Sequence, residues 1–266
     1  MRSANNKARS VLRFRNAIVR QPGPSVVGGL RADDRGDPNY DALLEEHGAY
    51  VLALIRADVE VSVLPPLAAY PDAVFVEDPA LVFPEGAILL RPGAPSRRGE
   101  VDEIADELRS RFDRVLELPA PVFAEGGDVL VTPDRVLVGL SARTDEAGAR
   151  ELIACLKELG RVGEIVQTPA DVLHFKTDCS LLDDETVFVT KRLARSDVFA
   201  GMKTVLVPDG EEAAANALRV NDVVLVGSDY PKSIELLSGL GYDVVPLKTT
   251  EIGKIDAGLS CMSLRW

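Results

Sequence analysis

Lys254-Ile-Asp-Ala-Gly-Leu-Ser-Cys-Met-Ser-Leu-Arg-Trp266 closes the chain and constrains its architecture more than any other stretch. Gly258 permits an unusual backbone turn, and the alternation after Cys261 is typical of a short strand with one apolar face. Chain ends fray unless something holds them, so a strand at this position needs a partner. The opposite end offers one, because Leu12–Val19 also alternates loosely and is predicted to be a strand.

Between the two ends one pattern repeats: a hairpin, then a helix, then a returning strand. The hairpins are predicted at Ala73–Glu77 with Ala87–Arg91, Asp128–Thr132 with Arg135–Val138, Cys179–Leu182 with Thr186–Thr190, and Ala217–Val220 with Val223–Val226. They recur every ~36 to 51 residues, a period typical of a cyclic or stacked array.

Helices are predicted after the first strand and after each hairpin. Asp37-Pro38 has the pattern of an N-cap followed by proline in the first turn, and apolar residues from Tyr40 to Ile55 then mark one face of a helix. The others are predicted at Gly99–Phe112, at Thr144–Gly160 with Thr144 as N-cap and Gly160 as C-cap, near Ser196–Gly201, and at Pro231–Leu240.

A fifth hairpin arises if Cys261–Trp266 pairs with the strand near Phe14–Val19. This closure would remove the exposed edges that an open array leaves. The pattern therefore predicts an α/β fold, a five-bladed propeller of ββαβ units with pseudo-fivefold symmetry, helices outside and a polar mouth at the centre. It would be one domain over residues 11–266, after a disordered tail over residues 1–10. A doubly wound sheet is the alternative, but hairpins followed by helices fit it badly.

The composition narrows the classes of function. A formal charge of −12 repels phosphate backbones, which argues against nucleic acid and favours a cationic small molecule. No apolar run approaches the ~20 residues that cross a bilayer, and no apolar signal core precedes the first strand. The three cysteines lack metal-ligand spacing and an even count, so neither a zinc site nor a disulfide framework is predicted. The expected compartment is a reducing cytoplasm.

A cysteine held where a loop meets a strand is a candidate nucleophile, although Cys261 alone fits an ordinary buried thiol as well. A cysteine and a distant histidine form a known catalytic arrangement, because the imidazole activates the thiol and protonates a leaving group. The chain has two histidines. His47 lies on the apolar face of a helix and is expected to be a packed residue, whereas His174 precedes a hairpin at the ring interior.

Charged residues are predicted to converge on the same mouth. Glu125-Gly-Gly-Asp128 occupies the place in its unit that Glu77-Asp78 occupies before another hairpin. Each acidic pair alone fits a turn, but together the carboxylates form a trap for a positively charged group. Arg97-Arg98 and Arg143 fit solvated arginines, and they are suited to clamping a carboxylate if they face the mouth.

Several longer motifs carry a resemblance to a known family. They are Phe75-Val-Glu-Asp-Pro79, Leu90-Arg-Pro-Gly-Ala94 with Ser96-Arg-Arg-Gly-Glu100, Ser141-Ala-Arg-Thr144, Leu173-His-Phe-Lys-Thr177, and the stretch from Lys254 to Arg265. In this order they resemble the dimethylarginine dimethylaminohydrolases of the bacterial type, from about Phe14 to the last residue. The resemblance implies the five-bladed α/β propeller of the guanidino-group-modifying (pentein) enzymes, which agrees with the repeats.

The resemblance also implies roles for individual residues. Cys261 would be the nucleophile, His174 the general acid and base, and Glu125 the residue that orients the histidine. Seven further residues would bind the substrate: Glu77 and Asp78 its guanidinium, Arg97 and Arg143 its carboxylate, and Asp72 with backbone groups of Leu30 and Ile255 its α-amino group.

The implied activity is hydrolysis of asymmetric dimethylarginine and monomethylarginine to citrulline and dimethylamine or methylamine, through a covalent thiouronium on Cys261. Neither a metal nor an organic cofactor is implied. The alternatives are an arginine deiminase that releases ammonia, and a non-catalytic ring that binds a cationic amino acid. The residues leave open the oligomeric state, a homodimer among the alternatives. They also leave open whether Cys261 rests as a thiolate paired with His174 or as a neutral thiol.

Overall fold

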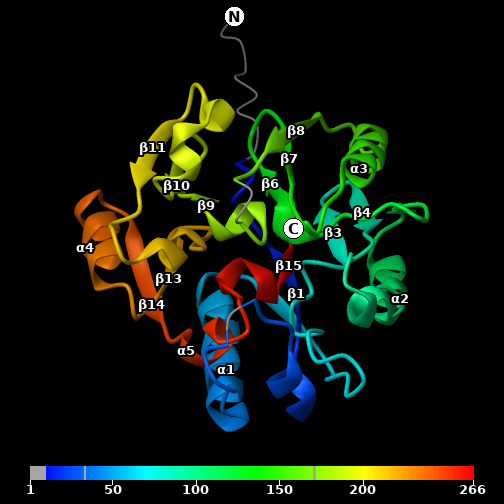
Figure 1. Cartoon of the computed structure of the whole chain (residues 1–266), viewed down its shortest axis with the longest axis horizontal. Helices are drawn as coiled ribbons and strands as arrows, with labels where there is room; N and C mark the ends of the chain where they lie inside the picture. The colour runs from blue at the N-terminus through cyan, green and yellow to red at the C-terminus, as the bar shows by residue number, and fades with distance from the viewer. Residues whose placement is uncertain (1–9, 33, 170–171) are drawn as a thin grey trace, which may run out of the picture.

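The residues that the structure describes, 10–32, 34–169 and 172–266, form five three-stranded sheets around a central axis (Figure 1). The structure is a computed structural model. In every sheet the middle strand pairs antiparallel with one neighbour and parallel with the other. This arrangement confirms the predicted five-bladed α/β propeller of ββαβ units.

Each sheet takes three strands, and four of the sheets take them from consecutive parts of the chain. The strands, sheet by sheet, are β15 (Leu264–Arg265), β1 (Asn16–Arg20) and β2 (Glu60–Leu64); β3 (Ala80–Phe83), β4 (Gly86–Leu89) and β5 (Val115–Glu117); β6 (Val129–Val131), β7 (Val136–Leu140) and β8 (Gly163–Gln167); β9 (Cys179–Leu181), β10 (Thr186–Val189) and β11 (Lys203–Leu206); β12 (Leu218–Val220), β13 (Val223–Gly227) and β14 (Asp243–Leu247).

Helices lie at the outside of the ring, as predicted, and pack their apolar faces on the sheets (Figure 1). They are α1 (Tyr40–Arg56), α2 (Asp102–Arg111), α3 (Glu146–Glu158) and α4 (Pro231–Gly239), with the short α5 (Thr250–Gly253) before the C-terminal stretch. In the unit of β9–β11, the helix predicted near Ser196–Gly201 is replaced by two 3-10 turns, Leu193–Arg195 and Asp197–Phe199. None of the helices in the described chain has the length and apolar character needed to cross a membrane.

The two ends of the chain share one sheet, which confirms the predicted closure. β15 pairs antiparallel with β1, with Ala17 opposite Arg265 and Ile18 opposite Leu264. The Trp266 carbonyl also accepts from the backbone N–H groups of Arg15 and Asn16, at 2.9 and 3.0 Å. The last strand thus completes the first unit, and the sheet of β1 has no missing inner strand.

One predicted strand was wrong. Ala73–Glu77 is a buried run of turns, and the first strand of that hairpin is β3, which begins at Ala80. The backbone of the run is bonded to other segments instead of a sheet neighbour. The carbonyl of Phe75 accepts from Arg97, and the N–H of Glu77 donates to the Cys261 carbonyl. These apolar residues are buried in a loop that supports the mouth.

Two predicted helix caps were displaced. α1 is capped by Asn39, whose side chain accepts from the Ala42 N–H, while Asp37 pairs with Arg31 at 2.9 Å. α3 is capped by Asp145 instead of Thr144, which is buried and donates to Asp128. Gly160 does stop α3, with a φ of +78° that favours glycine.

The disordered tail at the start of the chain stays a prediction. The predicted tail falls on residues 1–10, of which 1–9 lie outside the described residues. Ser10 is described, and its hydroxyl donates to the Asp184 carboxylate at 2.8 Å.

Leu264→Ala should lower the free energy of unfolding by about 2–5 kcal/mol, because Leu264 is 3% exposed and packs with Ile18 and Phe112 where the ring closes. Urea denaturation followed by circular dichroism measures the loss. Val162→Ala is the matched control, since Val162 is 66% exposed and should change stability by less than about 0.5 kcal/mol. Equal stability of the two variants would show that the closing strand is not part of the cooperative core.

Candidate active site

Four of the predicted site residues lie at equivalent places in the ring, each in the loop just before the first strand of a unit. Asp78 precedes β3, Glu125 precedes β6, His174 precedes β9 and Cys261 precedes β15. These first strands are the inner ones, and neighbouring units meet through them, β15 with β3 and β9 with β12. The fold therefore gathers residues from distant parts of the sequence at one end of the axis.

His174 and Glu125 form the central pair of the site. The His174 Nε2 lies 2.7 Å from a carboxylate oxygen of Glu125, and the second oxygen accepts from the Gly93 N–H at 3.0 Å. Burial would lower the pKa of His174, but Asp78 and the two neighbouring carboxylates, Glu125 and Asp128, outweigh burial and raise the pKa to about 9. At neutral pH His174 is therefore an imidazolium, an acid with a proton to give.

Cys261 lies in a short 3-10 turn, Leu259–Met262, directly before β15. Its N–H donates to the Gly258 carbonyl at 3.3 Å, and its carbonyl accepts from the Glu77 N–H at 3.2 Å. Burial, followed by the carboxylates of Glu77 and Asp78, raises the pKa of the thiol to about 12. Of the two resting states that the sequence allows, this geometry favours the neutral thiol.

Asp78 is a buried carboxylate held at both oxygens. One oxygen accepts from the Gly127 N–H at 3.1 Å, and the other from Arg97 at 2.5 Å. Burial would raise the pKa of Asp78, but the charges of Arg97 and His174 outweigh it and lower the pKa. Asp78 therefore stays ionised beside His174. A residue that is to hold a cation needs this negative charge.

Arg97 has partners other than the predicted substrate carboxylate. Its guanidinium is 6% exposed and donates to Asp78, to both oxygens of Glu100, and to the carbonyls of Asp72 and Phe75. In this structure Arg97 holds the loop that carries Asp78, so its role toward a substrate carboxylate stays a prediction.

Arg143 lies near the His174–Glu125 pair. Its side chain is 23% exposed, and one guanidinium nitrogen lies 3.9 Å from Glu125. Within the described chain its guanidinium makes no hydrogen bond, so its donors remain available to an anionic group.

Leu30, Asp72 and Ile255 do meet, as predicted. The Leu30 N–H donates to the Asp72 carboxylate at 2.9 Å. Gly29 packs tightly against Asp72 and Ile255. A Cβ added to Gly29 would lie 3.2 Å from the Asp72 carboxylate and 3.4 Å from the Ile255 side chain. Burial raises the pKa of Asp72, against the lowering effect of the Arg97 charge. Leu30, Asp72 and Ile255 therefore lie together, and Asp72 supplies the acidic group among them.

Glu77 is buried like its neighbour Asp78. Its carboxylate contacts Lys176 at 2.5 Å and Arg265 at 3.3 Å, and it accepts from the Ser260 hydroxyl at 3.2 Å. Glu77 therefore already has cationic partners, and it acts on Cys261 through its charge and its backbone N–H.

Sequence reasoning missed Asn216, which joins the cysteine loop to the histidine loop. Its side-chain oxygen accepts from the Ser260 N–H at 3.0 Å, and its amide donates to the Lys176 carbonyl at 3.2 Å. Asn216 stands just before β12, the place that Asp78 occupies before β3. The signal that could have found it is therefore the repeat itself: one polar residue before each inner strand.

Asp128, one of the carboxylates predicted to converge on the mouth, is engaged by protein groups. It is fully buried and accepts from the hydroxyls of Ser141 and Thr144, at 2.7 and 2.6 Å, and from the Phe175 N–H at 2.8 Å. It thereby ties the loop before α3 to the loop that carries His174.

The ligand atoms of Asp78, Glu125 and His174 lie within 4.8 Å of one another, close enough for a metal ion. Each of the three is already paired with a protein group, Asp78 with Arg97 and Glu125 with His174. The cluster is fully explained as a network of hydrogen bonds.

A ring of five ββαβ units with a cysteine, a histidine–glutamate pair and a buried aspartate at its mouth defines a guanidino-group-modifying enzyme of the pentein type. The chain is 40% identical to the N(G),N(G)-dimethylarginine dimethylaminohydrolase of Pseudomonas aeruginosa, over 95% of this chain and 100% of the relative. It is 34% identical to the Streptomyces coelicolor protein of the same name, over 94% and 96%. A family model described as N,N dimethylarginine dimethylhydrolase, eukaryotic, matches residues 31–161. The chain belongs to the dimethylarginine dimethylaminohydrolase family.

Solved structures agree with this assignment. The Pseudomonas aeruginosa enzyme, as a cysteine-to-serine mutant complexed with citrulline, superposes with a TM-score of 0.92 at 38% identity, over 95% of this chain and 99% of that one. The N-terminal domain of a cyanobacterial arginine dihydrolase superposes with a TM-score of 0.83 at 19% identity, over 94% and 97%, and shares the fold.

Gly127→Ala should lower kcat by roughly a hundredfold, because an added Cβ would lie 2.7 Å from the His174 ring and push it off Glu125. Citrulline release from dimethylarginine measures the loss. Gly239→Ala is the control, since an added Cβ there meets nothing within 4 Å. A Gly127→Ala variant with full activity would contradict this placement of the histidine.

The alkylation of Cys261 by the neutral reagent iodoacetamide should be slow at pH 7 and should accelerate as the pH rises toward 12. Only the thiolate reacts, and the thiol pKa is about 12. Glu77→Gln removes a negative charge that raises this pKa, so its profile should shift to lower pH. Glu85→Gln, at an exposed glutamate paired with Arg161, should leave the profile unchanged. A rate that does not vary with pH would indicate a standing thiolate.

Proposed function

We propose that this chain hydrolyses Nω-methylated arginines to citrulline and the corresponding methylamine, with Cys261 as nucleophile. The observation that carries the proposal is the convergence of Cys261, the His174–Glu125 pair and ionised Asp78 at one end of the ring, in a chain of this family. A buried site rich in carboxylates suits a delocalised cation, which is a poor electrophile until its plane is held.

The proposed substrate pose uses three groups of residues. Asp78 faces the guanidinium, while Glu77, which Lys176 and Arg265 already engage, contributes negative charge beneath it. Asp72, with the backbone of Leu30 and Ile255, takes the α-amino group, because it is a buried carboxylate at the rim. Arg143 takes the carboxylate, supported by its free donors, and Arg97 stays the predicted second partner.

The resting protonation states suggest how the reaction begins. Free enzyme at neutral pH would hold a thiol on Cys261 and an imidazolium on His174. A bound guanidinium brings a positive charge next to the thiol, which lowers its pKa, and the proton leaves to solvent. The enzyme would therefore form its thiolate only when a cationic substrate is present.

The chemical steps then follow from the proton on His174. The Cys261 thiolate attacks the central guanidinium carbon, forming a C–S bond. His174 gives its proton to the departing amine as the C–N bond breaks, which leaves a thiouronium on the enzyme. Neutral His174 next takes a proton from water, and the hydroxyl adds to the same carbon. The C–S bond breaks as the electron pair returns to sulfur, and the hydroxyl proton passes to the thiolate, which restores the Cys261 thiol and releases citrulline. Glu125 stabilises the imidazolium before the amine departs and again after the water is deprotonated.

The alternatives are less favoured. The arginine dihydrolase domain is only 19% identical to this chain, and this likeness supports the fold alone. The relatives at 40% and 34% identity are both named dimethylarginine dimethylaminohydrolases. A ring that only binds a cationic amino acid has no need of a histidine paired with a glutamate or of a cysteine in the loop before β15.

Citrulline should form from asymmetric dimethylarginine and monomethylarginine, and much more slowly from arginine. Cys261→Ser should lower turnover by roughly a thousandfold or more, because the hydroxyl is a far weaker nucleophile. Cys155→Ser is the matched control: Cys155 lies on α3, outside the site, and should be dispensable. Turnover of arginine alone would make the protein a deiminase, and undiminished activity of Cys261→Ser would remove the nucleophile from this proposal.

A further inference from the structure

The loop before each inner strand of the ring carries one polar residue, and Asn216 holds the fifth of these positions. Asp78, Glu125, His174 and Cys261 hold the other four, and all four belong to the candidate active site. The unit of β12–β14, which Asn216 precedes, lies between the unit of β9–β11 and the sheet of β15 and β1 (Figure 1). In the order of the ring, Asn216 therefore stands next to both the histidine and the cysteine.

The half-buried side chain of Asn216 bonds to one loop on each side. Its Oδ1 accepts from the N–H of Ser260, which directly precedes Cys261, at 3.0 Å. Its Nδ2 donates at 3.2 Å to the carbonyl of Lys176, in the 3-10 turn that follows His174. Both partners are backbone groups, so one bond needs an acceptor and the other a donor. Among side chains of this length, only an amide supplies the two at separate atoms.

Asn216 also packs tightly against Gly258, three residues before Cys261. A Cβ added to Gly258 would lie 2.3 Å from the Cγ of Asn216 and 2.5 Å from its Oδ1. Gly258 has a φ of −128° and a ψ of −174°, extended backbone that any residue adopts, so the unusual turn expected of this glycine is absent. The close approach of the Asn216 amide is what requires a glycine here.

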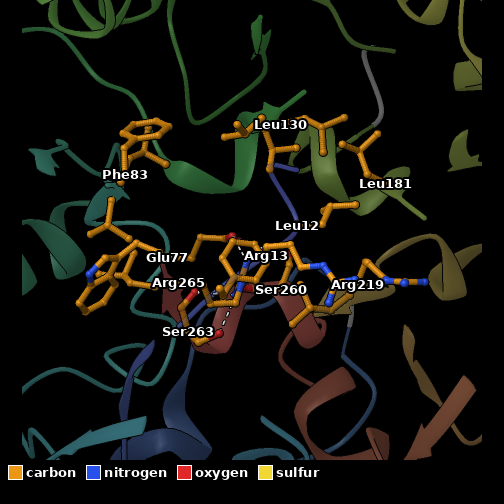
Figure 2. Close-up of a pocket in the computed structure, with 18 of the residues that line it drawn as sticks. Leu12, Arg13, Glu77, Phe83, Leu130, Leu181, Arg219, Ser260, Ser263 and Arg265 are labelled. Carbon is orange, nitrogen blue, oxygen red and sulfur yellow. Dashed lines mark hydrogen bonds and ion pairs between the residues drawn. The ribbon is translucent and has the colours of Figure 1, made fainter. Parts of the chain in front are cut away.

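The cysteine loop has a second support in Glu77. The Glu77 carboxylate accepts from the Ser260 hydroxyl at 3.2 Å, and the Glu77 N–H donates to the Cys261 carbonyl. Glu77 and Ser260 both line the cavity inside the ring that Figure 2 shows. Glu77 reaches the histidine loop only through the long side chain of Lys176. Asn216, in contrast, bonds to the backbone of both loops and fixes them more closely.

We propose that Asn216 is a positioning residue, which sets the Cys261 sulfur relative to His174 and to the cation that Asp78 holds. The proposal rests on the proposed function, in which Cys261 is the nucleophile. A misplacement of about 1 Å can cost on the order of a hundredfold in rate. Asn216 acts through the two loops and has no predicted contact with substrate. Its loss should therefore lower rate constants and leave substrate affinity nearly unchanged.

The first test compares two alkylating reagents on the full chain. 2-Chloroacetamidine is a cation, and 2-chloroacetamide is its neutral analogue. In both reactions the Cys261 thiol loses its proton to solvent, the thiolate forms a C–S bond, and chloride leaves. Peptide mass spectrometry of Cys261 gives the two rate constants, and their ratio cancels changes in thiol pKa and general exposure. Asn216→Ala should lower this ratio roughly tenfold or more, because the sulfur no longer meets a cation held at Asp78.

Asn221→Ala is the matched control for lost stability. Asn221 lies in the β12–β13 turn of the same unit, where its side chain bonds to the Phe14 N–H and to the carbonyls of Phe14 and Ala57. This variant should be less stable but keep the wild-type reagent ratio and kcat. In citrulline release from dimethylarginine, Asn216→Ala should lower kcat roughly tenfold or more, with KM within about twofold of wild type.

A second variant tests the same contact with the asparagine in place. Gly258→Ala suits the extended backbone, but its Cβ would push the Asn216 amide away from the Ser260 N–H. It should therefore lower the reagent ratio as Asn216→Ala does. Gly239→Ala, whose added Cβ meets nothing within 4 Å, should leave the ratio unchanged.

The outcomes separate this proposal from the proposed function. A full wild-type ratio in Asn216→Ala or in Gly258→Ala would overturn the positioning role. A wild-type ratio near one, or an equal fall in Asn221→Ala, would overturn it as well. If the wild-type protein prefers the amidine but releases no citrulline from methylarginines, the proposed function fails, and the reagent ratio still decides the role of Asn216.

Discussion

The pairing of β15 with β1 is the constraint on which both the ring and its chemistry depend. Without it the first unit would lack an inner strand, and the ring would have two open edges. The same pairing holds the turn that carries Cys261, because only two residues separate the cysteine from β15. Closure of the ring and the position of Cys261 therefore depend on the same strand pairing.

The site gathers acidic groups and offsets them only in part. Arg97 pairs with Asp78 and Lys176 pairs with Glu77. Two further carboxylates, Glu125 and Asp128, lie near His174. The outcome is a histidine that keeps its proton and a cysteine that keeps its own, since both states relieve the excess of negative charge. The guanidinium of the proposed substrate would supply a positive charge that offsets this excess.

The repeats predicted the ring, because the alternation of residues within a strand and the glycine or proline at strand ends are local features that can be recognised in the sequence. The cysteine, the histidine and the carboxylates could be predicted for a similar reason: few residue types can do this chemistry. Ala73–Glu77 was misjudged because an apolar, β-branched run predicts burial but not the partner of its backbone, which here is Arg97 and Cys261. Asn216 gave no signal of its own, since its two bonds join loops that are remote in sequence.

The layer of Glu77, Lys176 and Arg265 explains why one ring can present two unlike environments. Inner strands of a small ring leave a central space, and its two ends differ only through the side chains that divide it. On the cysteine side the loops before the strands supply carboxylates. On the other side the strands themselves supply the lining, with apolar residues on β3 and β6 and an arginine on each of β12 and β15. Because Glu77 also donates its N–H to the Cys261 carbonyl, any displacement of this layer changes the setting of the nucleophile.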